Sequence, residues 1–233
     1  MDFIAKNIAE VAPSMTLSIT AQAKALKKQG IDVLSFGAGE PDFDTPAHIT
    51  AAAVEALQSG KTRYTESAGI LELREAIAAK FLVDNQLQYE PNQISVNCGA
   101  KHSCYNAILA VVNPGDEVII PAPYWTSYPE MVRLVGGIPV IVETKRENDW
   151  KITPEEFEDA MSPMTKMIII NSPGNPTGSV YSKEELAKIG EIAAGEDIII
   201  LSDEIYEKLV YAGEKHVSIA SISKEIYDHT ITI

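Results

Sequence analysis

Two runs of apolar residues, each followed by a polar motif, stand out in the second half of the chain. Met167–Ile170 precedes Asn-Ser-Pro-Gly-Asn-Pro-Thr-Gly at 171–178, and Ile198–Leu201 precedes Ser-Asp-Glu-Ile-Tyr at 202–206. Residues 182–194 between them have a helical pattern. A strand, a helix and a second strand in this order predict a βαβ unit with parallel strands. Both polar motifs are then expected at the carboxyl edge of a sheet, where open α/β folds bind ligands.

The same alternation of short apolar runs and helical patterns extends over most of the chain. Strands separated by helices predict the α/β class, with a mostly parallel sheet sandwiched by helices. The predicted strands are 31–36, 93–97, 117–120, 138–142, 167–170, 198–201 and 230–233. The predicted helices are 18–28, 46–58, 70–85, 99–112, 127–134, 154–160, 182–194 and 219–226, and residues 1–17 are expected to be irregular.

Composition and charge narrow the class of protein. The 233 residues are 45% hydrophobic and 22% charged, as in globular domains that bury a sizeable core. A net charge of −14 argues against binding to nucleic acid or to an anionic membrane through charge alone. No run approaches the roughly 18 apolar residues of a membrane helix, and no signal-peptide pattern is present. Two cysteines, Cys98 and Cys104, make no disulfide framework, so a cytoplasmic location is expected.

Metal sites, hydrolase triads and nucleotide-binding loops find no support in the sequence. The histidines lie at positions 48, 102, 216 and 229, without the spacing of metal ligands. No G-x-S-x-G is present, no G-x-G-x-x-G follows a predicted strand, and no phosphate-binding loop of the G-x-x-x-x-G-K-[ST] type occurs. A nucleotide-binding α/β protein is therefore a distant alternative.

Three polar side chains are expected to converge where the two apolar runs end. Asp203 follows four apolar residues, so its carboxylate is partly desolvated and needs a cationic partner or hydrogen-bond donors. A pyridinium nitrogen is one such cation, although a turn or helix-capping role is the alternative for a single aspartate. Tyr206 lies three residues further on, and Asn175 lies at the end of the preceding strand. Together, an amide, a phenol and a carboxylate can bind the oxygen and the nitrogen of a hydroxypyridine.

Two further motifs also follow predicted strands. Gly99-Ala100-Lys101 opens a helix, whose free backbone N–H groups and dipole favour a phosphate. A tight structural turn is the alternative for this motif. The indole of Trp125 is placed to stack on an aromatic ligand, with packing in the core as the alternative.

These motifs together resemble a known family. The sequence is similar to the fold-type I pyridoxal-phosphate aminotransferases, and most closely to the bacterial aspartate aminotransferases. The likeness runs over the whole chain, in order and with matching spacing. The motifs that carry it are 37–46, 64–69, 99–101, 122–125, 171–178 and 202–206, with Gly174 as a small departure from the family pattern.

The resemblance implies a role in binding pyridoxal phosphate for each matched residue. Asp203 pairs with the protonated ring nitrogen and keeps the ring an electron sink. Tyr206 and Asn175 hydrogen-bond the phenolic oxygen of the ring, and Trp125 stacks on it. The backbone from Gly99 through Ala100 to Lys101 holds the phosphate.

The resemblance also implies a homodimer and a substrate site. Tyr64 reaches the phosphate of the neighbouring subunit, and the backbone N–H of Gly39 binds the substrate carboxylate. Thr16 and Lys101 help to select an acidic side chain. Trp125 and Asn175 belong to the same substrate site. Aspartate and 2-oxoglutarate are the expected substrates; aromatic amino acids, alanine, prephenate or a lyase reaction of the same fold remain alternatives.

One residue that the family's chemistry requires is missing. The lysine that binds the cofactor covalently and carries the proton stands beyond the strand that ends here at Ile233. Lys224 precedes that strand and is predicted to be a surface lysine. We therefore expect an N-terminal fragment that is inactive alone, with an N-terminal arm and part of a small domain at 1–45 and an incomplete cofactor-binding domain at 46–233. A truncated, non-catalytic binding or dimerisation module is the alternative from another class.

Overall fold

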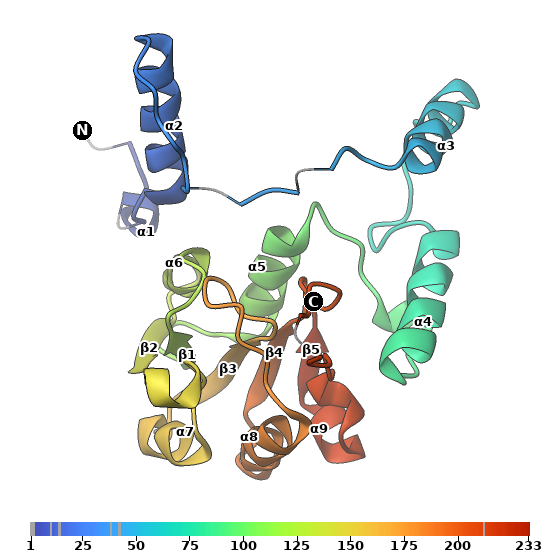
Figure 1. Ribbon diagram of the computed structural model, residues 1–233. Helices are drawn as coiled ribbons and strands as arrows, with labels where there is room; N and C mark the ends of the chain where they lie inside the picture. Colours follow the sequence, from blue (N-terminus) through green and yellow to red (C-terminus); the bar gives the residue numbers. More distant parts are fainter. Residues whose placement is uncertain (1–2, 10, 14, 38, 42, 212) are drawn as a thin grey trace. The chain divides into compact units, whose positions relative to one another are not determined.

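Five parallel strands form one sheet in the computed structural model, in the order β2-β1-β3-β4-β5 (Figure 1). This confirms the predicted α/β class with a parallel sheet. The strands are β1 (Glu117–Ala122), β2 (Ile138–Glu143), β3 (Thr165–Asn171), β4 (Ile199–Asp203) and β5 (Thr230–Thr232). The α-helices are α1 (Lys6–Ala9), α2 (Met15–Lys28), α3 (Ala47–Gln58), α4 (Leu71–Asn85), α5 (Ala100–Val111), α6 (Ser127–Leu134), α7 (Pro154–Ala160), α8 (Lys183–Gly195) and α9 (Lys224–Asp228). Short 3₁₀ turns are η1 (Pro91–Gln93), η2 (Arg146–Asn148) and η3 (Ile219–Ser221).

The chain divides into two units, Met1–Ala12 with Leu71–Ile233, and Pro13–Ile70. The structure describes residues 3–9, 11–13, 15–37, 39–41, 43–211 and 213–233, with the backbone alone at Lys6, Met15 and Thr16. The unit Pro13–Ile70 contains α2 and α3, and α3 buries none of its residues. No helix within the described ranges has both the length and the apolar character needed to span a bilayer.

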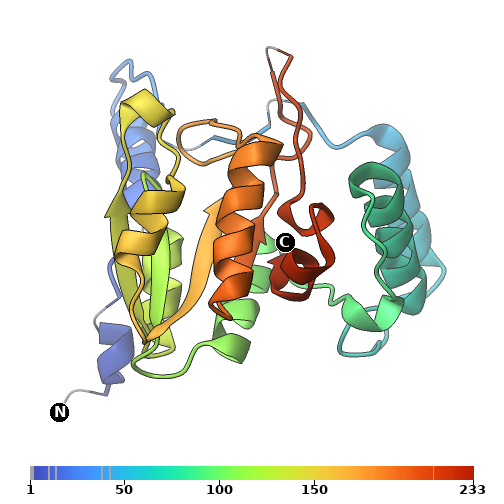
Figure 2. The ribbon, with the colours of Figure 1, turned by 90° about the horizontal axis from the view of Figure 1, so that it is seen from below.

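The alternation of side chains along the strands builds one core on each face of the sheet. Ile168 and Ile170 of β3 pack with Phe157 of α7 and with α8 and α9, whereas Met167 and Ile169 pack with α5 and α6. Figure 2 shows α7, α8 and α9 in front of the sheet and α5 behind it. Strands buried on both faces are apolar at every position, which is why they read as continuous apolar runs in the sequence.

Polar residues fix where the crossover helices begin. Ser182 caps α8 in a capping box with Glu185, and Thr153 caps α7 in the same way with Glu156. Both side chains satisfy backbone N–H groups that the first helical turn leaves unpaired. Helix α5 differs, because it follows Gly99, which has a φ of 84° and no side chain to cap it.

Two predicted strands are wrong. Residues 31–36 form no strand. Residues 93–97 form none either, and Gln93 is the last residue of the η1 turn. A strand needs a hydrogen-bonded neighbour, and the described residues supply none to either segment. The prediction that residues 1–17 are irregular is also wrong in part, because α1 lies there and α2 begins at Met15.

Candidate functional site

Asp203 is the last residue of β4, and it lies on the face of the sheet that α5 and α6 cover. Leu201, two residues earlier, packs in the core beneath these helices, and side chains alternate along a strand. Asp203 is paired in register with Asn171, the last residue of β3. The two polar motifs therefore meet at the carboxyl edge of neighbouring strands, as predicted.

The Asp203 side chain is buried among hydrogen-bond donors. The residue is 3% exposed, and the Tyr128 hydroxyl from α6 donates to its Oδ2 at 2.5 Å. The Cys104 thiol from α5 lies 3.8 Å from the same oxygen, and the Ile205 backbone N–H donates to Oδ1 at 3.2 Å. Within the described part of the chain, no Lys, Arg or His forms an ion pair with Asp203. A buried carboxylate held this way is prepared for a cation that none of the described residues supplies.

The Tyr128 and Cys104 donors keep their protons at neutral pH, whereas burial destabilises the ionised form of the Asp203 carboxylate. Desolvation raises the pKa of Cys104 to about 12, and it also raises the pKa of Tyr128. Desolvation likewise raises the pKa of Asp203, and the hydrogen bonds from Tyr128, Ile205 and Cys104 oppose this rise. The ionised form of Asp203 is therefore costly in the folded protein without a bound cation.

We expect Asp203→Asn to stabilise the unliganded protein at neutral pH. Because the folded pKa of Asp203 is raised, its favourable contribution exists at acid pH and is lost as the pH rises through that pKa. Asparagine is neutral throughout, so its gain over wild type should be larger at about pH 7 than at about pH 4, by about 1–3 kcal/mol. Urea unfolding at both pH values measures this. The exposed Asp159→Asn is the control, and an equal gain in both variants would contradict the explanation.

Asn171 organises the loop that carries Asn175. Its Nδ2 donates to the backbone carbonyl of Asp203 at 2.8 Å, and its Oδ1 accepts from the backbone N–H of Asn175 at 2.7 Å. One side chain thus ties the loop after β3 to the end of β4. A small cavity of about 30 Å³ lies beside this loop, lined in part by Tyr124, Tyr128 and Asn175.

The predicted phosphate-binding turn and the predicted stacking residue lie over the same face of the sheet. Among the described residues, the backbone N–H groups of Ala100 and Lys101, at the start of α5, have no hydrogen-bond partner. The Lys101 ammonium lies 4.9 Å from the centre of the Trp125 ring. Trp125 in turn packs edge-on against Tyr128, at 5.3 Å between ring centres. The N-terminus of α5 and the indole of Trp125 are thus connected to Asp203 through Tyr128.

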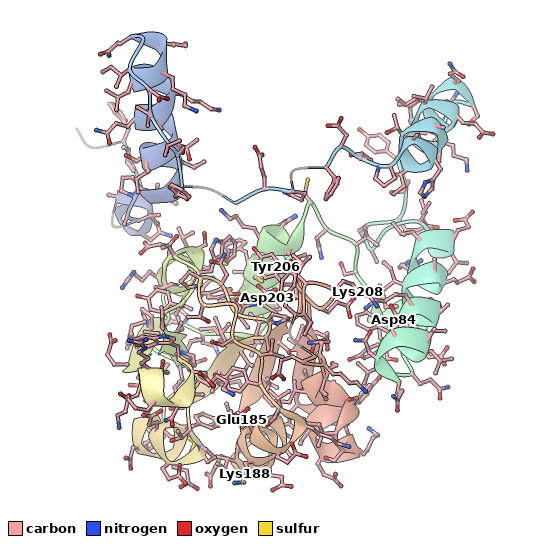
Figure 3. The ribbon with its side chains drawn as sticks, in the orientation of Figure 1. Asp84, Glu185, Lys188, Asp203, Tyr206 and Lys208 are labelled. Carbon is pink, nitrogen blue, oxygen red and sulfur yellow. The ribbon has the colours of Figure 1, made fainter. Side chains whose placement is uncertain are left out.

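Tyr206 follows Asp203 on a turn that is fastened to α4. Figure 3 shows Tyr206 next to Asp203, with Lys208 and Asp84 nearby. Lys208 pairs with Asp84 at 2.9 Å, and Glu207 pairs with Lys80. These contacts hold the turn that presents the phenol.

The unit that contains the sheet holds most of the predicted site residues, and the other unit holds the rest. Asn175, Asp203 and Tyr206, with Trp125 and the 99–101 turn, lie in the unit that contains the sheet. Thr16, Gly39 and Tyr64 lie in the other unit, where Tyr64 is fully exposed and the space around Gly39 is open. The side chain of Thr16 lies outside the described residues. The roles of these residues stay predictions.

Three residues of the site were missed by sequence reasoning. Tyr128, Cys104 and Asn171 all hold Asp203, and the first two lie 75 and 99 residues from it in the chain. The available signal was weak: Tyr128 lies three residues after Trp125, in the first turn of the helix that follows the 122–125 motif.

Glu204 was also not singled out, and it points to the opposite face of the sheet. Its Oε1 accepts from the hydroxyls of Ser202 and Ser218, at 2.9 and 2.8 Å, and its Oε2 lies 2.9 Å from His216 Nε2. These contacts stabilise the end of β4 on the face of the sheet opposite to the Asp203 side chain.

Lys224 lies on the surface, as predicted. Its side chain is 73% exposed and pairs with Asp228 in the next helical turn. Helix α9 ends at Asp228, and β5 begins at Thr230, so Lys224 belongs to the amino edge of the sheet. Asp203 ends β4 at the opposite edge.

A profile of the family described as "Aminotransferase class I and II" matches residues 31–232. The chain belongs to this family. The resemblance found in the sequence is thereby confirmed, and membership in this aminotransferase family implies a pyridoxal-phosphate cofactor.

Individual relatives agree with the family. An aspartate aminotransferase from Bacillus sp. (strain YM-2) is 53% identical over 232 residues, covering 100% of this chain and 59% of that protein. An aspartate/prephenate aminotransferase from Cereibacter sphaeroides is 48% identical, with 100% and 58% covered. The solved structure of the Thermus thermophilus aspartate aminotransferase with maleate has a TM-score of 0.95 at 45% identity, covering 100% of this chain and 60% of that chain. The chain thus spans about three fifths of the length of these relatives.

Proposed function

We propose that this chain holds pyridoxal phosphate at the carboxyl edge of β3 and β4. We further propose that the whole protein transfers an amino group from aspartate to 2-oxoglutarate. The observation that carries the proposal is the buried Asp203 carboxylate, which has hydrogen-bond donors but no ion-pair partner among the described residues. A protonated pyridine nitrogen supplies the missing cation.

The other residues fit the remaining parts of such a cofactor. The N–H groups of Ala100 and Lys101 lie at a helix N-terminus, which favours an anionic phosphate. The indole of Trp125 offers a flat surface to the ring, while Asn175 and Tyr206 flank Asp203 with an amide and a phenol that can bind the ring oxygen. The cofactor, when bound, supplies the electron sink that makes carbon–hydrogen cleavage at an amino acid feasible.

We propose a preference for an acidic substrate, as the resemblance to the aspartate aminotransferases implies. Lys101 places a positive charge beside the site, and Thr16 and Gly39 are proposed to join it in binding the carboxylates of aspartate. Prephenate is a second candidate substrate of the whole protein, because several of the similar proteins are named aspartate/prephenate aminotransferases. Comparison of aspartate, alanine and an aromatic amino acid as donors, with 2-oxoglutarate and prephenate as acceptors, separates the candidates.

The proposed assembly is a homodimer in the cytoplasm, in which Tyr64 reaches the phosphate bound by the partner. In this proposal, residues 1–45 form an arm and part of a small domain, and residues 46–233 belong to the cofactor-binding domain. The chain is proposed to bind the cofactor without a covalent link and to be inactive alone.

Titration of this chain with pyridoxal phosphate tests the cofactor site. We expect saturable binding that quenches tryptophan fluorescence and changes the absorbance of the ligand. Pyridoxal without the phosphate should bind about tenfold more weakly or worse, because the helix N-terminus then has no anion to hold. Equal binding of pyridoxal and pyridoxal phosphate would contradict the proposed orientation, and the absence of saturable binding would refute the site.

A further inference from the structure

The function proposed above gives no role to the buried hydroxyl of Tyr128. Tyr128 is 2% exposed, and its hydroxyl reaches from α6 to the end of β4, where it donates to Asp203 Oδ2 at 2.5 Å. We propose that Tyr128 is a positioning residue that fixes the orientation of the Asp203 carboxylate and keeps it ionised for a cationic ring nitrogen. The inference rests on the proposed cofactor site and goes beyond it by naming the group that prepares Asp203.

The donors around Asp203 are divided unequally between its two oxygens. Tyr128 and, more weakly, Cys104 donate to Oδ2, whereas Oδ1 accepts only the backbone N–H of Ile205 among the described residues. An ionised carboxylate has about four lone-pair directions. Oδ1 therefore has a lone pair without a donor among the described residues, and we expect the ring N–H of the ligand to donate to it. Without the Tyr128 hydroxyl, the carboxylate loses its shortest contact and is free to turn.

The ring of Tyr128 also connects Asp203 to the proposed stacking surface. It packs edge-on against Trp125 with an interplanar angle of 85°, and the Lys101 ammonium lies over the Trp125 ring. Replacement by phenylalanine keeps this packing and removes only the hydroxyl. Tyr128→Phe therefore separates the effect on the carboxylate from the effect on the aromatic surface.

The electrostatic surroundings give the direction of the effect. Burial raises the pKa of Asp203, and so does the adjacent charge of Glu204, whereas the Tyr128 hydrogen bond lowers it. The other titratable groups nearby are Cys104 from α5, which also donates to Asp203, and Tyr206, which lies close enough to Tyr128 to interact with it electrostatically. Removing the hydroxyl raises the pKa of Asp203 further. When the pH is lowered, the carboxylate of the variant is therefore protonated at a higher pH than that of wild type.

Two measurements test Tyr128→Phe. Carbon-13 NMR of labelled aspartate, with the Asp203 signal assigned through Asp203→Asn, follows the titration of Asp203 in the unliganded protein. Pyridoxal-phosphate titrations from about pH 5.5 to about pH 8.5 follow the affinity. We expect the Asp203 titration to move to higher pH. We also expect the affinity near neutral pH to fall about tenfold, with the largest loss at the acid end.

Tyr181→Phe is the matched control. Tyr181 is also buried, at 5% exposure, and its hydroxyl accepts the backbone N–H of Ile152 in the core on the other face of the sheet. It should change neither the Asp203 titration nor the pH dependence of binding. If Tyr128→Phe fails to fold, Cys104→Ala, which removes the weaker donor to the same oxygen, should act in the same direction with a smaller effect.

The outcomes are distinguishable. An unchanged Asp203 titration in Tyr128→Phe, or an equal loss of affinity in Tyr181→Phe, overturns the positioning role. A shifted Asp203 titration in a protein that binds no pyridoxal phosphate supports the link between Tyr128 and Asp203 and overturns the proposed cofactor site.

Discussion

Asp203→Ala is expected to weaken pyridoxal-phosphate binding by about 100-fold, or ~2.7 kcal/mol. The substitution removes the acidic partner that the proposed site offers to the ring nitrogen, and it leaves the Tyr128 hydroxyl and the Ile205 N–H without their acceptor. The loss combines a charge-assisted hydrogen bond with the cost of unpaired buried donors. Equilibrium titration followed by fluorescence measures the affinity of both proteins.

Asp159→Ala is the control for the change of net charge. Asp159 is exposed on α7, and α7 packs on the opposite face of the sheet from the Asp203 side chain. It should bind the cofactor as wild type does. Affinities of Asp203→Ala and wild type that agree within a factor of two would show that Asp203 is not the anchor of the ring.

The second large effect is the absence of turnover from this chain alone. We expect no transamination of aspartate with 2-oxoglutarate above the rate that free pyridoxal phosphate gives in buffer. Proton transfer at the reacting carbon needs a base within hydrogen-bond reach. The amines of Lys208 and Lys224 are ion-paired to Asp84 and Asp228, and Lys224 lies at the far edge of the sheet. Lys101 lies beside the site, where its ammonium contacts the Trp125 ring.

Borohydride reduction of the loaded chain, followed by peptide mass mapping, tests the same prediction chemically. The expected result is no stoichiometric label on Lys101, Lys208 or Lys224, because the amines of Lys208 and Lys224 are ion-paired and that of Lys101 lies against the Trp125 ring. One label per chain on Lys101 or Lys224, accompanied by turnover, would refute the proposed inactivity. Lys224→Ala and Lys101→Ala then identify the amine responsible.

The sequence predicted the sheet and its polar edge well, for a physical reason. The strand residues 167–170 and 198–201 are buried on both faces, so burial alone makes them continuous apolar runs. Once these strands are recognised, parallel pairing brings Asn171 and Asp203 to adjacent positions. The prediction of a strand at 93–97 was wrong because an apolar pattern does not reveal whether a neighbouring strand is present.

The environment of Asp203 was not predictable in the same way. Its hydrogen bond to Tyr128 joins residues 75 positions apart, and it depends on how α6 packs against the sheet. Local sequence contains the period of a helix but not the partner that each side chain meets across the core. The residue types were visible, but their convergence on one carboxylate required the fold.

Nitrogen-15 NMR of pyridoxal phosphate labelled at the ring nitrogen tests the central claim most directly. Bound to the wild-type chain at neutral pH, the nitrogen should give the signal of the protonated ring, because the ionised Asp203 stabilises the pyridinium. Bound at saturation to Asp203→Ala, it should give the signal of the unprotonated ring. An unprotonated nitrogen in the wild-type complex, or the same protonated signal in both complexes, would contradict the assignment of Asp203 as the anchor of the ring.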